Sequence, residues 1–526
     1  MFRSLRQLLR LAAIARILAR HDALEPLLEL LRGPGTAPVL LRGIRYVFGR
    51  RNAAQLDARP GEKLAAALVE LGPAFIKFGQ MLSTRTDLLG ERVAADLAQL
   101  QDRLPPFPAS EARATIEREL GAPIGRLFAG FDDNPVSAAS IAQVHFALLP
   151  EEEGTGDPFP YREVAVKVLR PGIEAAFERD IALMEWLAEL IERTQHGLRR
   201  FRPIAVVETF AIIVQQEMDL RIEAAGATEL ARNFAGDDSY IVPAVDWQRT
   251  ARRVLTLQRL AGIRMDDRER LLAAGHDLHD ILAKAAAIFF NQAFRDGYFH
   301  GDQHPGNMFV DAAGRIGAVD FGIMGRLDRQ TRYYLADMLL GLLNRDYRRL
   351  AEIHFAAGYV PSSKSPEAFA QALRAIGEPI FGRPLADISF ARVLGQLFQI
   401  AQTFEMEVQP QLLLLQKNML MAEGVSRQLD PDLNIWTLAE PLIEDWMRDN
   451  RGPEARVREA LAETGRLVER LPRILRHLDT ALTGFAEGGL RLHPETIRAM
   501  GGGRRAGAPW WLVAVLGGLL LLVLVA

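Results

Sequence analysis

The chain has 526 residues, of which 49% are hydrophobic and 25% are charged, a composition that supports several folded domains and excludes global disorder. Its 63 basic and 66 acidic residues give a net charge of −3, which excludes a protein built mainly to neutralise nucleic-acid phosphates, so no nucleic-acid partner is expected. The absence of cysteine excludes disulfides, thiolate metal sites, iron–sulfur clusters and cysteine nucleophiles.

The N-terminal segment has the pattern of an amphipathic helix. Its first 21 residues contain five arginines and no acid, and the arginines lie opposite a face rich in leucine and alanine. The segment lacks the clean apolar stretch of a cleaved signal peptide. Two interpretations stay open: an interfacial helix on an anionic membrane surface, or a helix packed on the body of the protein.

Hydrophobic periodicity and Gly/Pro punctuation predict a mostly helical chain with a few groups of strands. Helices are expected at 22–60, 61–104, 109–130 and 172–234, and over most of 264–490. Strands are expected at 137–149, 163–169, 241–245 and 253–260, with short ones near 307–320. An acidic turn at 151–160 separates the first two strands.

Two segments near residue 150 resemble the nucleotide-binding strands of a protein kinase. Val164–Val168 places Lys167 between valines, as on the strand that carries a phosphate-binding lysine; a solvated surface lysine is the alternative. Ser137–Val144 has the register of a Gly-x-Gly-x-x-Gly-x-Val loop, but Ser137, Ala139 and Ala142 replace the glycines. Because a Cβ atom restricts positive φ and close backbone approach, this loop should hold nucleotide differently from a protein-kinase loop.

The most specific signal is the segment His300–Asn307, followed by Asp320-Phe321-Gly322. An Asp-x4-Asn spacing before an Asp-Phe-Gly is the arrangement of kinase-type phosphoryl transfer. Asp320 and Asn307 supply the hard oxygen ligands that Mg²⁺ prefers. Asp302 stands where it could orient or deprotonate an acceptor hydroxyl. The segment lacks the Arg that reads a phosphorylated activation loop, and no Ala-Pro-Glu follows, so no peptide-docking apparatus is visible.

The C-terminal segment is predicted to cross a membrane. Ala506–Ala526 is a run of 21 uncharged residues, long enough at ~1.5 Å per residue to span a bilayer core of roughly 30 Å. Trp510 and Trp511 resemble interfacial anchors, and Arg504 and Arg505 place the preceding chain on the cytoplasmic side. A buried C-terminal helix is the alternative.

These motifs identify the chain as similar to the UbiB family of atypical kinase-like proteins, which is linked to ubiquinone biosynthesis. The resemblance covers roughly residues 60–440. Its motifs are Lys77-Phe78-Gly79-Gln80, the Ala-rich loop 138–145, Glu217-Met218-Asp219, Glu223-Ala224-Ala225, the segment 300–307, Asp320-Phe321-Gly322 and the helical region 411–434. Bacterial members commonly carry two C-terminal transmembrane helices, whereas this chain has room for one.

The resemblance implies a role for each matching residue. The Lys77–Gln80 helix would fold across the active site, where Lys77 and Gln80 approach Glu217 and Asp219 as regulatory residues. Glu223 would pair with Lys167, although protein-kinase spacing alone would select Glu185. ATP or ADP with Mg²⁺ is the implied cofactor, with Asp302 as catalytic residue and Asn307 and Asp320 as metal ligands. The implied nucleotide-binding residues are Ala138, Ala139, Ser140, Ile141, Ala142, Val144, Lys167 and Glu223.

The expected fold is α+β: an atypical protein-kinase-like bilobal fold with an N-terminal helical extension, a helical C-terminal region and one C-terminal transmembrane helix. The expected regions are a basic helical segment (1–60), the Lys-x-Gly-Gln extension (61–135), a small lobe with a helical insert (136–262), a large lobe with C-terminal helices (263–500), a linker (501–507) and the transmembrane helix (508–526).

The resemblance implies an ATP-binding and ATP-hydrolysing regulator of ubiquinone biosynthesis at the inner (cytoplasmic) membrane, with its kinase-like domain in the cytoplasm. Membrane lipids, quinone precursors and other ubiquinone-biosynthesis proteins are the implied partners, and a homodimer is left open. Two alternatives remain: a kinase acting on a small molecule or lipid such as a quinone precursor, and a nucleotide-binding scaffold without turnover. Protein kinase activity on other chains is not expected.

Overall fold

The computed structural model of the chain describes residues 2–23, 58–83, 104–150, 159–194, 202–379 and 410–430, together with residue 199 and parts of 89–100, 396–406 and 438–450. Its contacts divide the chain into Met1–Trp446 and Met447–Ala526, and the elements below belong to the first unit. The predicted linker 501–507 and transmembrane helix 508–526 lie outside the described residues. Within the described part, no helix is both long and apolar enough to cross a membrane.

The small lobe is built on an antiparallel sheet, which is five-stranded in the described part of the chain. Its order is β1 (Gly130–Phe131), β3 (Ala142–Leu148), β4 (Glu163–Leu169) and β6 (Val254–Gln258), with β2 (Ser137–Ala138) paired to β3. The sheet thus begins just before the predicted boundary at residue 136. The predicted strand 137–149 is interrupted because residues 139–141 form the turn of the Ala-rich loop.

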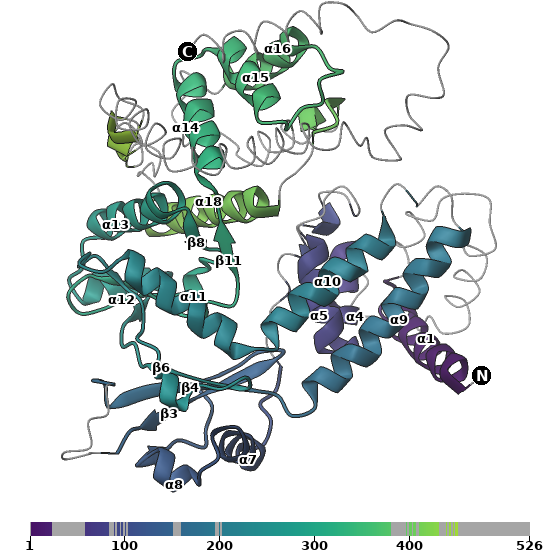
Figure 1. Cartoon of the computed structure of the whole chain (residues 1–526), viewed down its shortest axis with the longest axis vertical. Helices are drawn as coiled ribbons and strands as arrows, with labels where there is room; N and C mark the ends of the chain where they lie inside the picture. Colours follow the sequence, from purple (N-terminus) through teal and green to yellow (C-terminus); the bar gives the residue numbers. More distant parts are fainter. Residues whose placement is uncertain are drawn as a thin grey trace, which may run out of the picture. The chain divides into compact units, whose positions relative to one another are not determined.

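Strand β4 shows how alternation sets the two faces of this sheet. Val164, Val166 and Val168 are fully buried, and they pack with Ile116 of α7 (Ala109–Leu120) on one face. Lys167 therefore points to the opposite face. In Figure 1, α7 and α8 (Ile124–Leu127) lie beneath the strands, on the side away from the large lobe.

The predicted helical insert at 172–234 is three helices: α9 (Ile173–Thr194), α10 (Pro203–Glu217) and α11 (Leu220–Asn233). The extension contributes α4 (Pro60–Leu71) and α5 (Pro73–Ser83), which lie beside α9 and α10 (Figure 1). One apolar core joins these helices to the small-lobe sheet through Phe75, Phe177, Phe210 and Leu169. The extension is therefore part of the folded kinase-like body.

The N-terminal helix α1 (Phe2–Arg20) packs on α4, with Ile14 and Ala19 buried. Arg10 forms a bidentate ion pair with Asp180 of α9 at 3.0 Å, and Arg20 pairs with Glu70 at 2.9 Å. These contacts support the interpretation that α1 is packed on the rest of the protein. Arg10 and Arg20 pair with acids of the protein, so they are less available to bind an anionic membrane surface.

The large lobe contains α12 (Arg268–Ala273), α13 (Leu278–Phe290), a π-helical turn at Asn291–Asp296, α14 (Arg329–Leu343), α15 (Tyr347–Ala356), α16 (Pro366–Gly377) and α18 (Pro410–Leu429). A small sheet has the order β5 (Tyr240–Ile241), β10 (Ile316–Ala318), β9 (Met308–Val310) and β7 (Ile263–Arg264). A separate ladder pairs β8 (Tyr298–His300) with β11 (Met324–Arg326).

The sequence prediction was wrong for several of these short strands. The strand expected at 241–245 is only the two residues of β5, and β7, β8 and β11 were not anticipated. Strands of two or three residues are too short to show an alternating pattern, so their formation depends on partners far along the chain.

Buried His145 of β3 should make the stability of the small lobe depend on pH. Its Nδ1 donates to the Asp132 carbonyl at 2.8 Å, and its Nε2 accepts from Gln143 Nε2 at 2.8 Å. The backbone of Phe107 fixes the Gln143 amide, because its carbonyl accepts from Gln143 Nε2 and its N–H donates to Gln143 Oε1. A protonated imidazole would lose the Gln143 bond, and burial lowers the pKa of His145.

The folded-state pKa of His145 lies below its unfolded value of about 6.5, so stability is present at neutral pH and is lost on acidification. Below this unfolded-state pKa, we expect His145 to lower the free energy of unfolding by at most about 1.4 kcal/mol for each pH unit of acidification. Thermal midpoints at pH 7.5 and 5.5 should differ less in His145→Asn than in wild type. The exposed His279→Asn is the control, and an equal pH dependence in all three proteins would contradict the assignment.

Candidate nucleotide and metal site

Lys167 lies at the centre of a charged cluster on the face of the small-lobe sheet opposite its buried valines. Its Nζ is 2.8 Å and 3.0 Å from the two carboxylate oxygens of Glu223 on α11, and 2.9 Å from Asp320 Oδ1. The pairing with Glu223 is confirmed over the alternative Glu185, which lies on α9. Strand register places Val144 opposite Lys167, so both side chains share this face.

The electrostatics of the cluster favour a charged Lys167 and an ionised Asp320. Burial would lower the pKa of Lys167, but the charges of Asp320 and Glu223 overcome this effect and hold the pKa above its usual value. The charge of Lys167 holds the pKa of Asp320 far below its usual value. Burial raises the pKa of Glu223, while Lys167 opposes that shift. The Asp320 side chain is 52% exposed, so water screens part of its ion pair.

Asp320 is held in a conformation that few non-glycine residues adopt. Its φ is +65°, in the left-handed region, which costs of order 1 kcal/mol or more for a residue with a Cβ. Such a conformation persists only where surrounding contacts hold the residue in place. Here the Asp320 carboxylate is held by its contact with Lys167. Strain of this kind gathers at functional sites, and it supports Asp320 as a functional residue.

Buried His300 begins the segment 300–307, named the catalytic segment for its proposed role, and connects it to the residues before Asp320. Its Nδ1 accepts from the Asp302 N–H at 3.0 Å, and its Nε2 is 3.4 Å from the Val319 carbonyl. Burial lowers the pKa of His300, which agrees with a neutral ring that accepts at one nitrogen and donates at the other. The ring also meets Phe321 edge-on at 5.4 Å. His300 thus fixes the spacing between Asp302 and Asp320.

The two predicted metal ligands are brought to the same end of the β9–β10 hairpin. The Val319 N–H donates to the Asn307 carbonyl at 2.9 Å, so Asn307 lies opposite the residue that precedes Asp320. The Asn307 side chain donates to the Asp302 carbonyl at 3.3 Å, which leaves its amide oxygen as an acceptor. One carboxylate and one amide oxygen fit Mg²⁺, which usually takes one or two protein ligands together with phosphate and water. In the described residues, no group of three or more acidic, His or Cys side chains forms a metal cluster.

The Ala-rich loop is held from behind by Arg170. The guanidinium donates to the Ala139 carbonyl at 2.8 Å and 2.9 Å and to the Pro105 carbonyl at 2.9 Å, and it lies over the Phe107 ring. Ser140, Ile141 and Ala142 are buried, whereas Ala138 and Ala139 are partly exposed. The loop is therefore anchored into the core at its second half, and Ala138 and Ala139 are the residues best placed to meet a ligand.

Restoring glycine in this loop should change nucleotide preference. Ala139→Gly removes a Cβ and frees the backbone beside the phosphates, so we expect the ratio of ATP affinity to ADP affinity to shift several-fold. Titration of each nucleotide in the presence of Mg²⁺ measures this ratio. Ala313→Gly, in an exposed turn, is the matched control. An unchanged preference in Ala139→Gly would remove this loop from nucleotide discrimination.

Lys77 of α5 makes the predicted contact with Glu217, with a distance of 3.1 Å between Nζ and Oε2. Both side chains are largely buried, at 15% and 10% exposure. The charge of Lys167 is the main cause of the lowered pKa of Asp320, and the charge of Lys77 contributes to it. A Cβ on Gly79 would come within 2.6 Å of Leu68 and 2.7 Å of Leu100, so a glycine here lets α5 pack closely against these leucines.

Gln80 and Asp219 differ from the expected arrangement. Gln80 donates to the Leu100 carbonyl at 3.4 Å. Asp219 instead caps α11 by accepting from the Arg221 N–H at 3.1 Å, and its carboxylate pairs with the Arg221 guanidinium at 2.6 Å. Arg221, two residues along the chain, is a short-range partner, and it engages the acid that was expected to approach Lys77.

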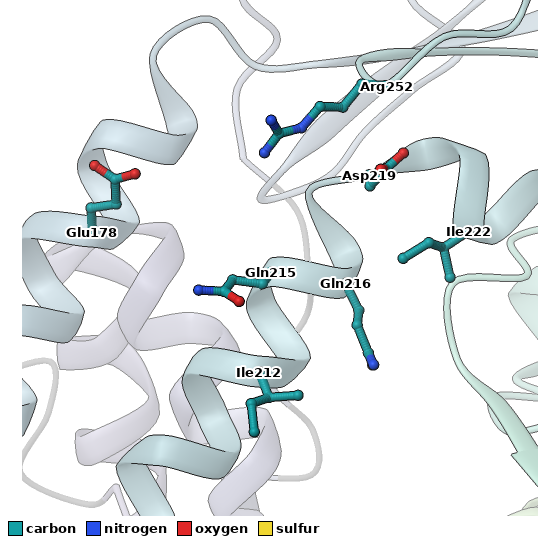
Figure 2. A pocket seen from close by; sticks show the side chains of 7 residues that line it. All are labelled: Glu178, Ile212, Gln215, Gln216, Asp219, Ile222 and Arg252. Carbon is teal, nitrogen blue, oxygen red and sulfur yellow. The ribbon is translucent and has the colours of Figure 1, made fainter.

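A shallow hollow lies beside Asp219 (Figure 2). It is lined by Glu178, Ile212, Gln215, Gln216, Asp219, Ile222 and Arg252. None of the residues that line it is Lys167, Asp302 or Asp320, so this hollow is separate from the charged cluster.

The sequence analysis missed two residues of α18 that contact the catalytic segment. Lys417 Nζ lies 2.6 Å from Asp302 Oδ1, and the buried Asn418 donates to the His300 carbonyl. Both lie about 115 positions away in the sequence, so no spacing rule connects them to Asp302. The resemblance had marked 411–434 as a helical region without assigning any of its residues to the site.

Known families match this chain over the two regions that build the site. Residues 99–354 match the ABC1 atypical kinase-like domain, and residues 373–434 match the UbiB helical domain. The chain is 44% identical over 433 residues to a "Probable protein kinase UbiB" of Marinobacter nauticus, covering 82% of this chain and 78% of the relative. It is also 44% identical over 480 residues to the protein of the same name from Xanthomonas campestris pv. campestris, covering 90% and 83%.

The chain belongs to the UbiB family. The kinase-like α+β fold expected from the sequence is thereby confirmed, and α18 falls within the UbiB helical domain. A solved structure agrees with this assignment: "The complex structure of Rv3197-erythromycin from Mycobacterium tuberculosis" is 26% identical, has a TM-score of 0.51, and covers 74% of this chain and 97% of its own.

Proposed function

We propose that this UbiB-family protein binds Mg²⁺–ATP, or ADP, at the charged cluster and hydrolyses ATP in support of ubiquinone biosynthesis. The observation that carries the proposal is the contact of Lys167 with both Glu223 and Asp320, with Asp302 and Asn307 on the adjoining segment. This is the set of groups that phosphoryl transfer needs: a cation for the phosphates, oxygen ligands for a metal, and a carboxylate for the acceptor.

Each residue has a defined task in this proposal. Lys167, oriented by Glu223, binds the α- and β-phosphates, and Asp320 and Asn307 hold the metal. A Mg²⁺ ion held by these two residues would supply positive charge to offset the negative charge that develops during transfer. Asp302 orients an acceptor oxygen and takes its proton, while the acceptor bonds to the γ-phosphorus and ADP leaves with the electrons of the broken P–O bond. For hydrolysis the acceptor is water.

In this proposal α5 covers the acceptor side of the site, as the family resemblance implies, which argues against a protein acceptor. Lys77 anchors α5 to Glu217 and adds its charge to the surroundings of Asp320. A helix that covers the site would admit water or a small acceptor more readily than a folded protein. A kinase acting on a quinone precursor is therefore the second candidate, because its acceptor hydroxyl would meet the same Asp302 as water does.

We further propose that the protein works at the inner (cytoplasmic) membrane, with the kinase-like body in the cytoplasm. The support is the uncharged run Ala506–Ala526, which has the length and composition of a membrane helix. Membrane lipids and quinone precursors are the proposed partners, along with other proteins of ubiquinone biosynthesis. No nucleic-acid partner is proposed, because the chain carries a net charge of −3.

Release of inorganic phosphate from ATP tests this function. The full chain and a form without residues 506–526 should be assayed with and without liposomes and quinone-precursor phenols. We expect Mg²⁺-dependent release that the lipid or phenol increases, and sedimentation with liposomes that weakens on truncation. A phosphorylated phenol would favour the kinase alternative, and tight nucleotide binding with no turnover would favour a scaffold.

A further inference from the structure

We propose that Lys417, supplied by the UbiB helical domain, is a further residue of the phosphoryl-transfer site and binds the oxygens of the γ-phosphoryl group. The inference rests on the proposed function and adds to it a second cation, placed on the acceptor side of the site.

The contact that points to this role is direct. Lys417 Nζ lies 2.6 Å from Asp302 Oδ1, and the two side chains are 41% and 32% exposed. The pair therefore lies at the open side of the catalytic segment, where a ligand can reach it. A lysine ammonium has three N–H donors, so it can contact Asp302 and a phosphate oxygen at the same time.

The neighbouring Asn418 fixes the position of Lys417. Asn418 is fully buried, and its side chain donates to the His300 carbonyl and accepts from the Gln303 N–H at 3.3 Å. Gln292 of the π-helical turn adds a second brace, since its side-chain oxygen accepts from the His300 N–H at 2.9 Å and from the Gln303 side chain at 3.3 Å. The residues on both sides of Asp302 are thus tied to α18, and Lys417 cannot shift along the segment without breaking buried bonds.

The catalytic segment, residues 300–307, has no lysine or arginine of its own that could contact the γ-phosphoryl group. His304 uses its Nδ1 to accept from the Gly306 N–H at 3.0 Å, within its own turn. Lys167 is engaged by Glu223 and Asp320 at the other side of the cluster. Since the transferred phosphoryl group spreads charge over three oxygens, a cation beside Asp302 is well placed to stabilise it as the acceptor attacks.

The test compares Lys417→Met and Lys417→Arg with wild type in the full chain. Lys417→Met keeps the length of the side chain and removes its charge. We expect its kcat for phosphate release to fall about 100-fold, and Lys417→Arg to retain most of the activity. The affinity for Mg²⁺–ADP should stay within about threefold, whereas the preference for ATP over ADP should fall about tenfold. Lys284→Met, which breaks an exposed 2.6 Å pair with Asp280 away from the site, is the matched control.

The two readouts separate the outcomes. Wild-type preference for ATP in Lys417→Met would overturn the inference; if kcat fell at the same time, Lys417 would only hold the catalytic segment in place. Absence of turnover in the wild-type protein would overturn the proposed hydrolysis, but the ratio of ATP to ADP affinity would still decide whether Lys417 meets the γ-phosphate.

Discussion

Replacing Asp320 by Asn should raise the dissociation constant of Mg²⁺–ATP by about 100-fold or more, equivalent to about 2.7 kcal/mol. The substitution keeps the size of the side chain but removes the negative charge that faces Lys167 and is proposed to hold the metal. Without Mg²⁺, the nucleotide affinity should change much less, because Lys167 keeps its contact with Glu223. The thermal shift produced by Mg²⁺–ATP, compared with that of ATP in EDTA, measures both effects.

Asp280→Asn is the control for this substitution, since it removes an exposed carboxylate that pairs with Lys284 outside the site. The fold should survive Asp320→Asn because the Asp320 side chain is half exposed and Lys167 is not left without an acid. An unchanged thermal shift by Mg²⁺–ATP in Asp320→Asn would mean that this cluster is not the metal and nucleotide site.

Removing Lys77 should loosen α5 and change the reaction without abolishing nucleotide binding. Lys77→Ala leaves Glu217 as a buried acid that has lost its ion-pair partner, and breaking a buried pair typically costs about 3–5 kcal/mol. The helix over the site should then open more often and admit larger acceptors. We expect phosphate from ATP to appear on the protein itself, and the rate of hydrolysis to change by at least several-fold. Mass spectrometry and phosphate release measure the two outcomes.

Two further variants show whether the effect comes from the buried charge. Lys77→Met combined with Glu217→Gln removes the buried charge at Glu217 as well, so it should loosen α5 less than Lys77→Ala does. Lys63→Ala, on the neighbouring helix α4, breaks the pair between Lys63 and Asp22 and serves as the control. If Lys77→Ala matched wild type in rate, product and support of quinone synthesis, the covering role of α5 would be refuted, while Asp302, Asn307 and Asp320 would remain candidates for the nucleotide site.

The sequence predicted the parts of the site that lie in ordered local motifs. Lys167 stands between buried valines on one strand, and the Asp302–Asn307 spacing belongs to one short segment, so pattern and register were sufficient to place them. The choice of Glu223 over Glu185 needed the family resemblance, because an intervening pair of helices separates Glu223 from Lys167 by 56 positions.

The remaining features depend on contacts that no local pattern records. Lys417 reaches Asp302 only because the buried amide of Asn418 locks α18 onto the catalytic segment. The short strand β8 forms because β11 pairs with it across the site. Asp219 was assigned to Lys77, but its position just before α11 favours a helix cap, and that local preference prevailed.

Phosphate release by the full chain in liposomes, compared between wild type and Asp302→Asn, tests directly whether Asp302 serves the proposed hydrolysis of ATP. Asp302 is the group proposed to receive the acceptor proton, and the exchange to Asn preserves its shape while removing that ability. We expect Mg²⁺-dependent release by wild type, a fall of about 100-fold or more in Asp302→Asn, and nearly equal binding of Mg²⁺–ADP by the two proteins. Equal rates of phosphate release from the two proteins would contradict this role of Asp302.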